Sequence, residues 1–516
     1  MDDGVDAGEI FGAHIPNVAA ENLERLRILP QVAALVEESV EPDDLVPRPP
    51  EPGSRDRADV AMVAGDQDSH RAHTIGSPAI SPDSFASMLR RRVANPTLRL
   101  GSGLVGRVVV TGLGAVTPLG LDAPSTWEAA VAGRSGVDWI RAFDATGYPV
   151  RIASEVKGFE PEAIVGPKDA RRLERNVVRA VSAAREAWND AGINGIDPAR
   201  AGVLVGSAIG GVMGVLAQNE VLEKRGHTRV SPWFLPNVLV DSASGQIAID
   251  LGVRGPNYAP VSACATGSHA VGEGAELIRR GGADVVLAGG TESCMHPVIL
   301  AGSTAMRGLV AEEKDPTRAS RPFDATRAGF VMGEGACVLL LEDLEHAEAR
   351  GARMYAEVLG YGTSNDAHHM AQPDPASVVV AEMMRAALSR SGVAPESVGY
   401  INAHGTSTPQ GDLAETNAIK EVFGEHAYEL AVSSTKSVLG HLFGAAGAVE
   451  AMMCVRALHE GVLPPTINYQ TPDPECDLDY VPNEARSAQV DVALSNAMGL
   501  GGHNACVLLG RVDERM

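Results

Sequence analysis

A cysteine and two histidines are the residues whose types and surroundings could carry out acyl transfer. Cys264 lies in the stretch Val-Ser-Ala-Cys-Ala-Thr-Gly, His404 opens His-Gly-Thr-Ser-Thr-Pro, and His441 closes Lys-Ser-Val-Leu-Gly-His. A thiolate attacks ester and thioester carbons, and imidazoles move protons or stabilise a developing negative charge. Local sequence alone leaves an alternative open, because a buried inert cysteine and structural histidines would look the same.

The elements expected around these residues favour the reactive interpretation. A β-branched, small-residue run precedes Cys264, and residues 268–281 follow with a helical pattern that ends in basic residues and glycine. Cys264 should therefore lie at or just before a helix N-terminus, where unpaired N–H groups and the helix dipole favour a thiolate. His404 follows an apolar run over 398–403, so it should stand at the end of a strand, a common place for reactive groups.

Apolar strands alternate with helical patterns from residue 107 onward. We predict buried strands beginning at 107 and over 202–206, 284–289, 336–342 and 504–509, and helices over 170–191, 268–280, 378–392, 412–422 and 445–460. This alternation is typical of an α/β protein whose sheet is covered on both faces. Residues 1–105 are rich in proline and charge, and we expect a mostly disordered extension with short helices over 20–38 and 82–93.

Composition excludes several classes of protein. The chain has 516 residues and a net charge of -23, which argues against nucleic-acid binding through its overall field. Its six cysteines form no Cys-x-x-Cys pair, so we expect neither a zinc site nor a disulfide framework. The sequence shows no signal peptide and no apolar run fit to span a bilayer, and we predict a cytoplasmic protein.

From about 107 to 510 the chain resembles the type II β-ketoacyl-[acyl-carrier-protein] synthases, condensing enzymes of the thiolase superfamily. Five segments carry the resemblance: 108–120, 262–266, 320–324 with 329–335, 404–412, and 434–450. The resemblance implies a five-layered αβαβα fold of two similar halves, about 106–355 and 356–511 within a domain over 106–511, and a homodimer.

The resemblance also implies a decarboxylative Claisen condensation. Cys264 would take an acyl group from acyl-carrier protein, and His404 and His441 would stabilise the enolate of malonyl-carrier protein after CO2 leaves. No metal or redox cofactor is implied. Lys436, with Glu450 as its partner, would support catalysis or, as an equal alternative, form a structural ion pair. Thr406 and Thr408 match the hydroxyls that bind the phosphopantetheine arm.

The family's oxyanion hole would correspond to the backbone N–H groups of Cys264 and Leu500. Met498 and Leu500 stand where the family usually has phenylalanine, the second of which gates the acyl pocket, so we expect a more permissive or differently ordered pocket. Gln410 replaces a residue that is often small beside the pantetheine tunnel. The basic residues of the family's carrier-docking helix correspond to Lys168, Arg171, Arg172 and Arg175, for which a solvated helix face is the alternative.

The favoured function is fatty-acid chain elongation, and a ketosynthase of a polyketide or specialised lipid pathway shares every motif. A non-catalytic chain-length factor fits poorly, since Cys264, His404 and His441 are all present. A thiolase would need a second cysteine in the glycine-rich loop over 496–504, and Cys506 lies beyond that loop.

Overall fold

One mixed β-sheet runs through the part of the chain that the computed structural model describes, residues 106–312 and 314–512. Within these residues its nine strands lie in the order β4-β5-β6-β1-β7-β13-β12-β8-β9. They are β1 (Val108–Val116), β4 (Ala201–Gly206), β5 (Val285–Glu292), β6 (Gly335–Asp343), β7 (Ala356–Asn365), β8 (Val398–Asn402), β9 (Ala431–Ser433), β12 (Val492–Gly499) and β13 (His503–Gly510). The predicted extension over 1–105, with its helices at 20–38 and 82–93, lies outside the described residues.

The strand pattern is repeated in the two halves of the sheet. In the first half β4 pairs parallel with β5, β5 antiparallel with β6, and β6 antiparallel with β1. In the second half β8 pairs parallel with β12, β12 antiparallel with β13, and β13 antiparallel with β7. The halves meet where Val108–Val110 pairs with Ala356–Val358. The predicted internal similarity is therefore confirmed at the level of topology.

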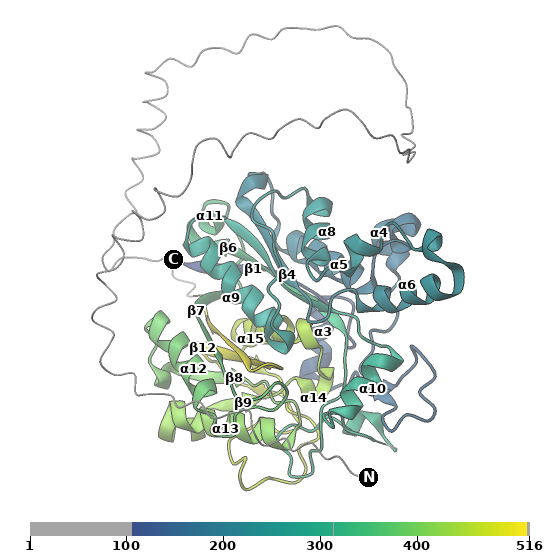
Figure 1. Cartoon of the computed structure of the whole chain (residues 1–516). Coiled ribbons are helices and arrows are strands. Elements are labelled where there is room, and N and C mark those ends of the chain that lie inside the picture. Colours follow the sequence, from purple (N-terminus) through teal and green to yellow (C-terminus); the bar gives the residue numbers. More distant parts are fainter. Residues whose placement is uncertain (1–105, 313, 513–516) are drawn as a thin grey trace, which may run out of the picture. The chain divides into compact units, whose positions relative to one another are not determined.

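Two central helices lie between the halves of the sheet (Figure 1). They are α9 (Thr266–Arg279) and α15 (Ala446–Glu460), which pack against each other. Their N-termini approach closely because Gly267 and Gly447 lack side chains: a Cβ at Gly267 would meet the Ala448 nitrogen at 2.4 Å, and one at Gly447 the Ser268 hydroxyl at 2.2 Å.

The outer faces of the sheet are covered by further helices (Figure 1). Helices α5 (Arg175–Ala191) and α8 (Ser242–Leu251) cover the first half, and α12 (Val378–Ser391) and α13 (Pro409–Phe423) cover the second. These layers confirm the αβαβα architecture. None of the described helices is long and apolar enough to cross a bilayer.

The remaining elements lie mostly in the connections between these strands and helices. They are α3 (Ala123–Val131), β2 (Asp138–Trp139), β3 (Ile152–Ala153), α4 (Pro161–Ala170), α6 (Val212–Arg225), α7 (Phe234–Val238), α10 (Pro297–Ala305), α11 (Leu344–Ala349), α14 (Lys436–Leu439), β10 (Val462–Leu463) and β11 (Arg486–Ser487). The predicted helix over 170–191 is wrong at its start. A separate helix α4, kinked at Gly166 (φ +77°) before Pro167, ends at residue 170, and α5 begins only at Arg175.

Candidate active site

Cys264 sits in a sharp turn just before the N-terminus of α9, as predicted. A 3-10 turn over Ala263–Ala265 leads into the helix, and Ala263 adopts a left-handed backbone conformation with φ +51°. Thr266 fixes the turn, because its hydroxyl accepts a hydrogen bond of 3.0 Å from the Ser262 N–H. The turn holds the thiol at the buried end of a cavity, where Cys264 is 6% exposed.

The prediction that this thiol ionises easily is wrong for the resting pocket. Burial raises the pKa of Cys264 to about 11, although Lys436 and a hydrogen bond from the Leu500 N–H lower it, and Glu292 and Glu450 raise it further. Desolvation of the sulfur outweighs the lowering of the pKa by Lys436 and the Leu500 N–H. Cys264 therefore starts as a neutral thiol whose proton must leave during attack.

His404 stands directly after β8, in a loop that a buried carboxylate holds in place. Glu415 accepts hydrogen bonds from the N–H groups of His404, at 2.9 Å, and Gly405, at 2.8 Å. Lys436 donates to His404 Nδ1 at 3.3 Å. Because Nδ1 is an acceptor, the proton of the neutral ring is on Nε2, which makes His404 a hydrogen-bond donor in the cavity it lines.

His441 lies beyond α14, and its ring meets that of His404 edge to face, with 5.4 Å between the ring centroids. Its backbone is fixed by a bond from its N–H to the Val331 carbonyl and one from the Gly333 N–H to its carbonyl, both 2.8 Å. Burial lowers the pKa of both imidazoles well below the usual value, and Lys436 lowers both further. The two histidines are therefore neutral at physiological pH.

Lys436 and Glu450 form a buried ion pair behind the histidines. Their side chains are 2% and 3% exposed, and neither is among the residues that line the cavity. Burial raises the pKa of Glu450 to about 7, although Lys436 lowers it. The pair does not reach the cavity itself, so Lys436 acts on the site through His404 Nδ1.

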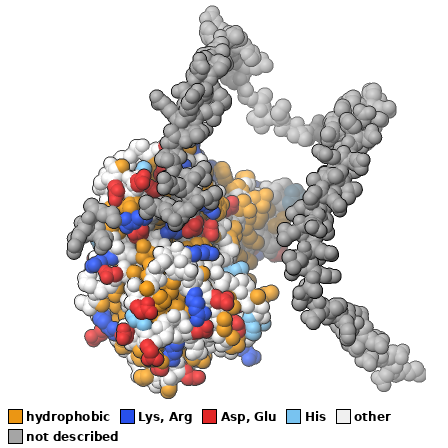
Figure 2. Space-filling model, turned by 90° about the vertical axis from the view of Figure 1, so that its left-hand side faces the viewer, with side chains coloured by type: hydrophobic (Ala, Val, Ile, Leu, Met, Phe, Trp, Pro, Cys, Tyr) orange, Lys and Arg blue, Asp and Glu red, His pale blue; other side chains and the backbone are white. Residues whose placement is uncertain are grey.

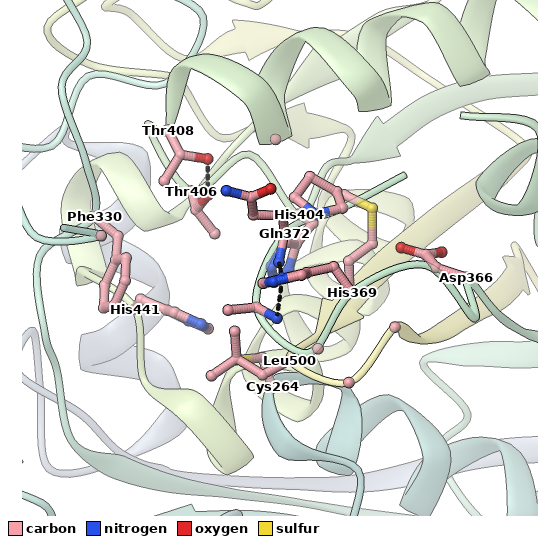
Figure 3. Close-up of a pocket in the computed structure, with 18 of the residues that line it drawn as sticks. Cys264, Phe330, Asp366, His369, Gln372, His404, Thr406, Thr408, His441 and Leu500 are labelled. Carbon is pink, nitrogen blue, oxygen red and sulfur yellow. Dashed lines mark hydrogen bonds between the residues drawn. The ribbon is translucent and has the colours of Figure 1, made fainter. Parts of the chain in front are cut away.

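The cavity of about 400 Å³ brings together most of the predicted site residues. Figure 3 shows Cys264 and Leu500 at one end, His404 and His441 beside them, and Thr406 and Thr408 toward the other end. The two threonine hydroxyls lie 3.0 Å apart. Met498 also lines the cavity. This arrangement can hold a long polar arm that delivers a reactive carbonyl to the thiol.

The hairpin between β12 and β13 brings Leu500 to the nucleophile. Gly499 is required here, because a Cβ on it would lie 2.6 Å from the Ser262 carbonyl and 3.2 Å from the Cys264 nitrogen. The Leu500 N–H then reaches the Cys264 sulfur, so the N–H groups of Leu500 and Cys264 come close together at the thiol. The Leu500 side chain is 41% exposed at the cavity wall.

Sequence reasoning missed several lining residues, among them Phe330, Asp366, His369, Gln372 and Phe443. Three of them follow β7 in a loop that backbone bonds join to the glycine hairpin. The Gly501 N–H donates to the Met370 carbonyl at 2.8 Å, and the Asp366 N–H to the Gly502 carbonyl at 2.9 Å. The two adjacent histidines His368 and His369 were the feature of the sequence that could have indicated a functional role for this loop.

Two groups of predicted residues lie away from the cavity lining. Gln410 is exposed in the first turn of α13, between the lining residues Thr408 and Gly411, and is not itself a lining residue, so its place beside the tunnel stays a prediction. The basic residues Lys168, Arg171, Arg172 and Arg175 do not share one helix: they span the end of α4, a turn and the first residue of α5. Arg172 stacks on Trp233 at 4.8 Å from the ring centroid.

No group of three or more His, Cys, Asp or Glu side chains among the described residues is arranged to hold a metal ion.

Comparisons with known proteins agree with the family resemblance found in the sequence. Residues 106–347 match the family model described as β-ketoacyl synthase, N-terminal domain, and residues 355–470 match β-ketoacyl synthase, C-terminal domain. The 3-oxoacyl-[acyl-carrier-protein] synthase 2 of Coxiella burnetii is 46% identical over 410 residues, covering 79% of this chain and 99% of the relative. The protein of the same name from Staphylococcus aureus is 47% identical over 409 residues, again 79% and 99%.

A solved structure shares the fold at lower identity. It is a type II polyketide acyl-carrier protein in complex with its ketosynthase bound to the hexaketide. The matched chain superposes with a TM-score of 0.74 at 34% identity, covering 79% of this chain and 100% of the matched one.

Proposed function

The chain belongs to the β-ketoacyl synthase family, and from this premise we propose how its cavity carries out fatty-acid chain elongation. The enzyme is an acyltransferase that condenses an acyl group with malonyl-[acyl-carrier protein] to give 3-oxoacyl-[acyl-carrier protein], CO2 and free carrier. The observation that carries the proposal is the convergence of Cys264, His404, His441 and the Leu500 N–H at one end of one cavity. The relatives at 46–47% identity favour elongation of fatty acids over polyketide synthesis.

In the first half-reaction Cys264 Sγ attacks the thioester carbon of the acyl-carrier protein. A C–S bond to Cys264 forms, the C–S bond to phosphopantetheine breaks, and the thiol proton ends on the departing carrier. The N–H groups of Cys264 and Leu500 stabilise the oxyanion of the tetrahedral intermediate. The threonines Thr406 and Thr408 hydrogen-bond the phosphopantetheine arm along the cavity.

In the second half-reaction malonyl-carrier protein loses CO2, and the electron pair of the broken C–C bond becomes an enolate. His404 and His441 donate hydrogen bonds to its oxygen, which suits two neutral imidazoles, of which His404 carries its proton on Nε2. The enolate carbon attacks the acyl-Cys264 thioester, a C–C bond forms, and Cys264 leaves and takes up one proton. Because these residues supply the charge stabilisation, we propose that no metal or redox cofactor takes part.

A local basic patch serves as the docking site for the acidic carrier protein. Lys, Arg, Asp and Glu side chains are interspersed on the face seen in Figure 2, and the whole chain has a net charge of -23, so attraction of an acidic carrier requires a local basic cluster. Lys168 and Arg171 are exposed, and Arg172 is braced against Trp233 beside them. Replacing Lys168 and Arg171 by glutamate should raise KM for carrier-bound substrates and leave KM for small thioesters unchanged; equal effects on both would exclude docking.

We also propose a homodimer, formed along the sheet edge beside β4. The segment after α8 runs next to β4, where Asn257 pairs with Val203, and its side chains Tyr258 and Val261 are 40% and 47% exposed. Exposed apolar groups at the edge of a sheet are suited to association with a second copy. The cytoplasmic localisation stays a prediction from the sequence.

Mass spectrometry of the intact protein tests the proposed function. After incubation with acyl-carrier proteins of different chain lengths, the wild-type protein should gain one acyl group, and Cys264→Ala should gain none. The wild type should then release CO2 from malonyl-carrier protein and form the 3-oxoacyl product. Acylation that survives in Cys264→Ala would refute the assignment of the nucleophile.

A further inference from the structure

The imidazole of His441 is held in place by ring contacts instead of hydrogen bonds. Its Nδ1 is buried and has no hydrogen-bond partner among the described residues, unlike Nδ1 of His404, which accepts from Lys436. The backbone bonds to Val331 and Gly333 fix where the residue sits, but they leave rotation of the ring about its side-chain bonds open. Whatever sets the plane of this ring must therefore act through packing.

Three rings surround His441, and Phe443 is the one that lies against it nearly parallel. Phe443 stacks at 5.1 Å between centroids with 21° between the planes. Phe330, seen beside His441 in Figure 3, and His404 meet it almost perpendicularly, at 83° and 88°. A stacked neighbour resists tilting of the imidazole, whereas edge contacts alone allow it.

The backbone of Phe443 repeats the turn that carries the nucleophile in the other half of the molecule. Ala263 and Phe443 are left-handed, with φ of +51° and +47°, and each opens a 3-10 turn that leads into a central helix. The first turn presents Cys264 at the N-terminus of α9. The second, over Phe443–Ala445 before α15, carries no reactive group and places an aromatic ring beside the cavity instead.

The surroundings hold this second turn firmly. Glu292 accepts a hydrogen bond of 3.1 Å from the Gly444 N–H, and Gly444 packs so closely on β5 that a Cβ at Gly290 would lie 2.1 Å from its carbonyl oxygen. A left-handed conformation is unfavourable for a bulky residue and persists only where the structure enforces it. The backbone of Phe443 is therefore held in place, and its ring stacks on His441 from a fixed position in the chain.

Resting on the proposed function, we propose that Phe443 is a positioning residue for His441: its stacked ring holds the imidazole plane so that Nε2–H points at the malonyl thioester oxygen. Phe443 touches no reacting atom in this role. Its loss should slow decarboxylation and condensation, which need His441, more than acylation of Cys264, which does not.

The test compares Phe443→Leu, which keeps an apolar side chain without the ring, with the conservative variant Phe443→Tyr. Acylation of Cys264 is followed by intact-protein mass, and CO2 release from malonyl-carrier protein is measured separately. We expect Phe443→Leu to lower kcat for CO2 release about 100-fold, as a misaligned donor would, with little change in the KM for malonyl-carrier protein. Acylation should change far less, and Phe443→Tyr should recover most of the decarboxylation rate.

Three results would overturn the proposal: an unchanged CO2 release in Phe443→Leu, an equal loss of acylation and decarboxylation, or no recovery in Phe443→Tyr. Phe443→Met serves as the second aliphatic variant should Phe443→Leu fail to fold, which its thermal unfolding will show. A wild-type protein that neither acylates nor releases CO2 would instead refute the proposed function, so the two failures are distinguishable.

Discussion

Replacing Lys436 by methionine separates its contribution to stability from its contribution to the site. In Lys436→Met the Glu450 carboxyl stays buried without a cation, and removing one partner of a buried ion pair costs about 3–5 kcal/mol of unfolding free energy. Burial already raises the pKa of Glu450 to about 7. The carboxyl can therefore escape part of the cost by protonation, so the loss should be greater at pH 8 than at pH 6.

The double variant Lys436→Met/Glu450→Met removes both charges at similar volume. Such replacements of buried ion pairs are often neutral or stabilising, so we expect unfolding free energy close to that of wild type. Decarboxylation of malonyl-carrier protein should stay roughly 100-fold reduced, because His404 Nδ1 has lost the donor that keeps its proton on Nε2. Denaturant unfolding at both pH values and a CO2-release assay measure the two quantities.

The outcome decides between the two interpretations of Lys436. If the double variant recovers both stability and decarboxylation, Lys436 is a structural ion-pair partner only, and the argument from His404 Nδ1 fails. If Lys436→Met is no less stable than the double variant at pH 8, the cost assigned to the unpaired carboxylate is wrong.

Three further predictions concern the hairpin and the partly buried acid Glu186. Gly499→Ala should slow acylation of Cys264 about 100-fold, because the new Cβ displaces the nucleophile turn; an unchanged rate in an intact-mass time course would contradict this. Leu500→Phe should narrow the range of acyl lengths that load onto Cys264, and identical profiles for carriers of several lengths would count against a gate at this position. Burial raises the pKa of Glu186 from 4.5 to about 7, so the folded protein keeps a proton that the unfolded chain releases, and stability should fall as pH rises between these values. Glu186→Gln should flatten this slope in unfolding measurements across the range, and an unaltered slope would disprove the contribution.

The reactive residues could be predicted from the sequence because each stands in a short motif at the end of an element. A strand before His404 and a helix after Cys264 are visible in the pattern of apolar residues, and the ends of such elements converge in an α/β fold. Pro167 signals the kink inside α4, but it lies before residue 170 and does not indicate that α5 begins only at Arg175.

Other features of the site depend on contacts between segments that are far apart in the sequence, and these contacts could not be predicted from residue types. The loop after β7 enters the cavity wall through backbone hydrogen bonds from Gly501 and Asp366, and such bonds leave no mark in the pattern of side chains. The raised pKa of Cys264 comes first from burial, which depends on segments far from Cys264 in the sequence, such as the hairpin that carries Leu500. The stacking of Phe443 on His441 likewise occurs where residue 443 has a left-handed backbone, which its residue type does not indicate.

The duplicated topology explains why the site needs both halves of the molecule. The first half supplies the nucleophile at the N-terminus of α9, and the second supplies His404, His441 and the threonines from around the N-termini of α13 and α15. The two central helices can bring these groups together only because Gly267 and Gly447 allow their N-termini to touch. A 3-10 turn with a left-handed first residue precedes both helices. The turn before α9 carries the thiol of Cys264, and the turn before α15 carries the ring of Phe443. A substitution that separates α9 from α15 should therefore impair both half-reactions, whereas one confined to the second turn should affect only the condensation.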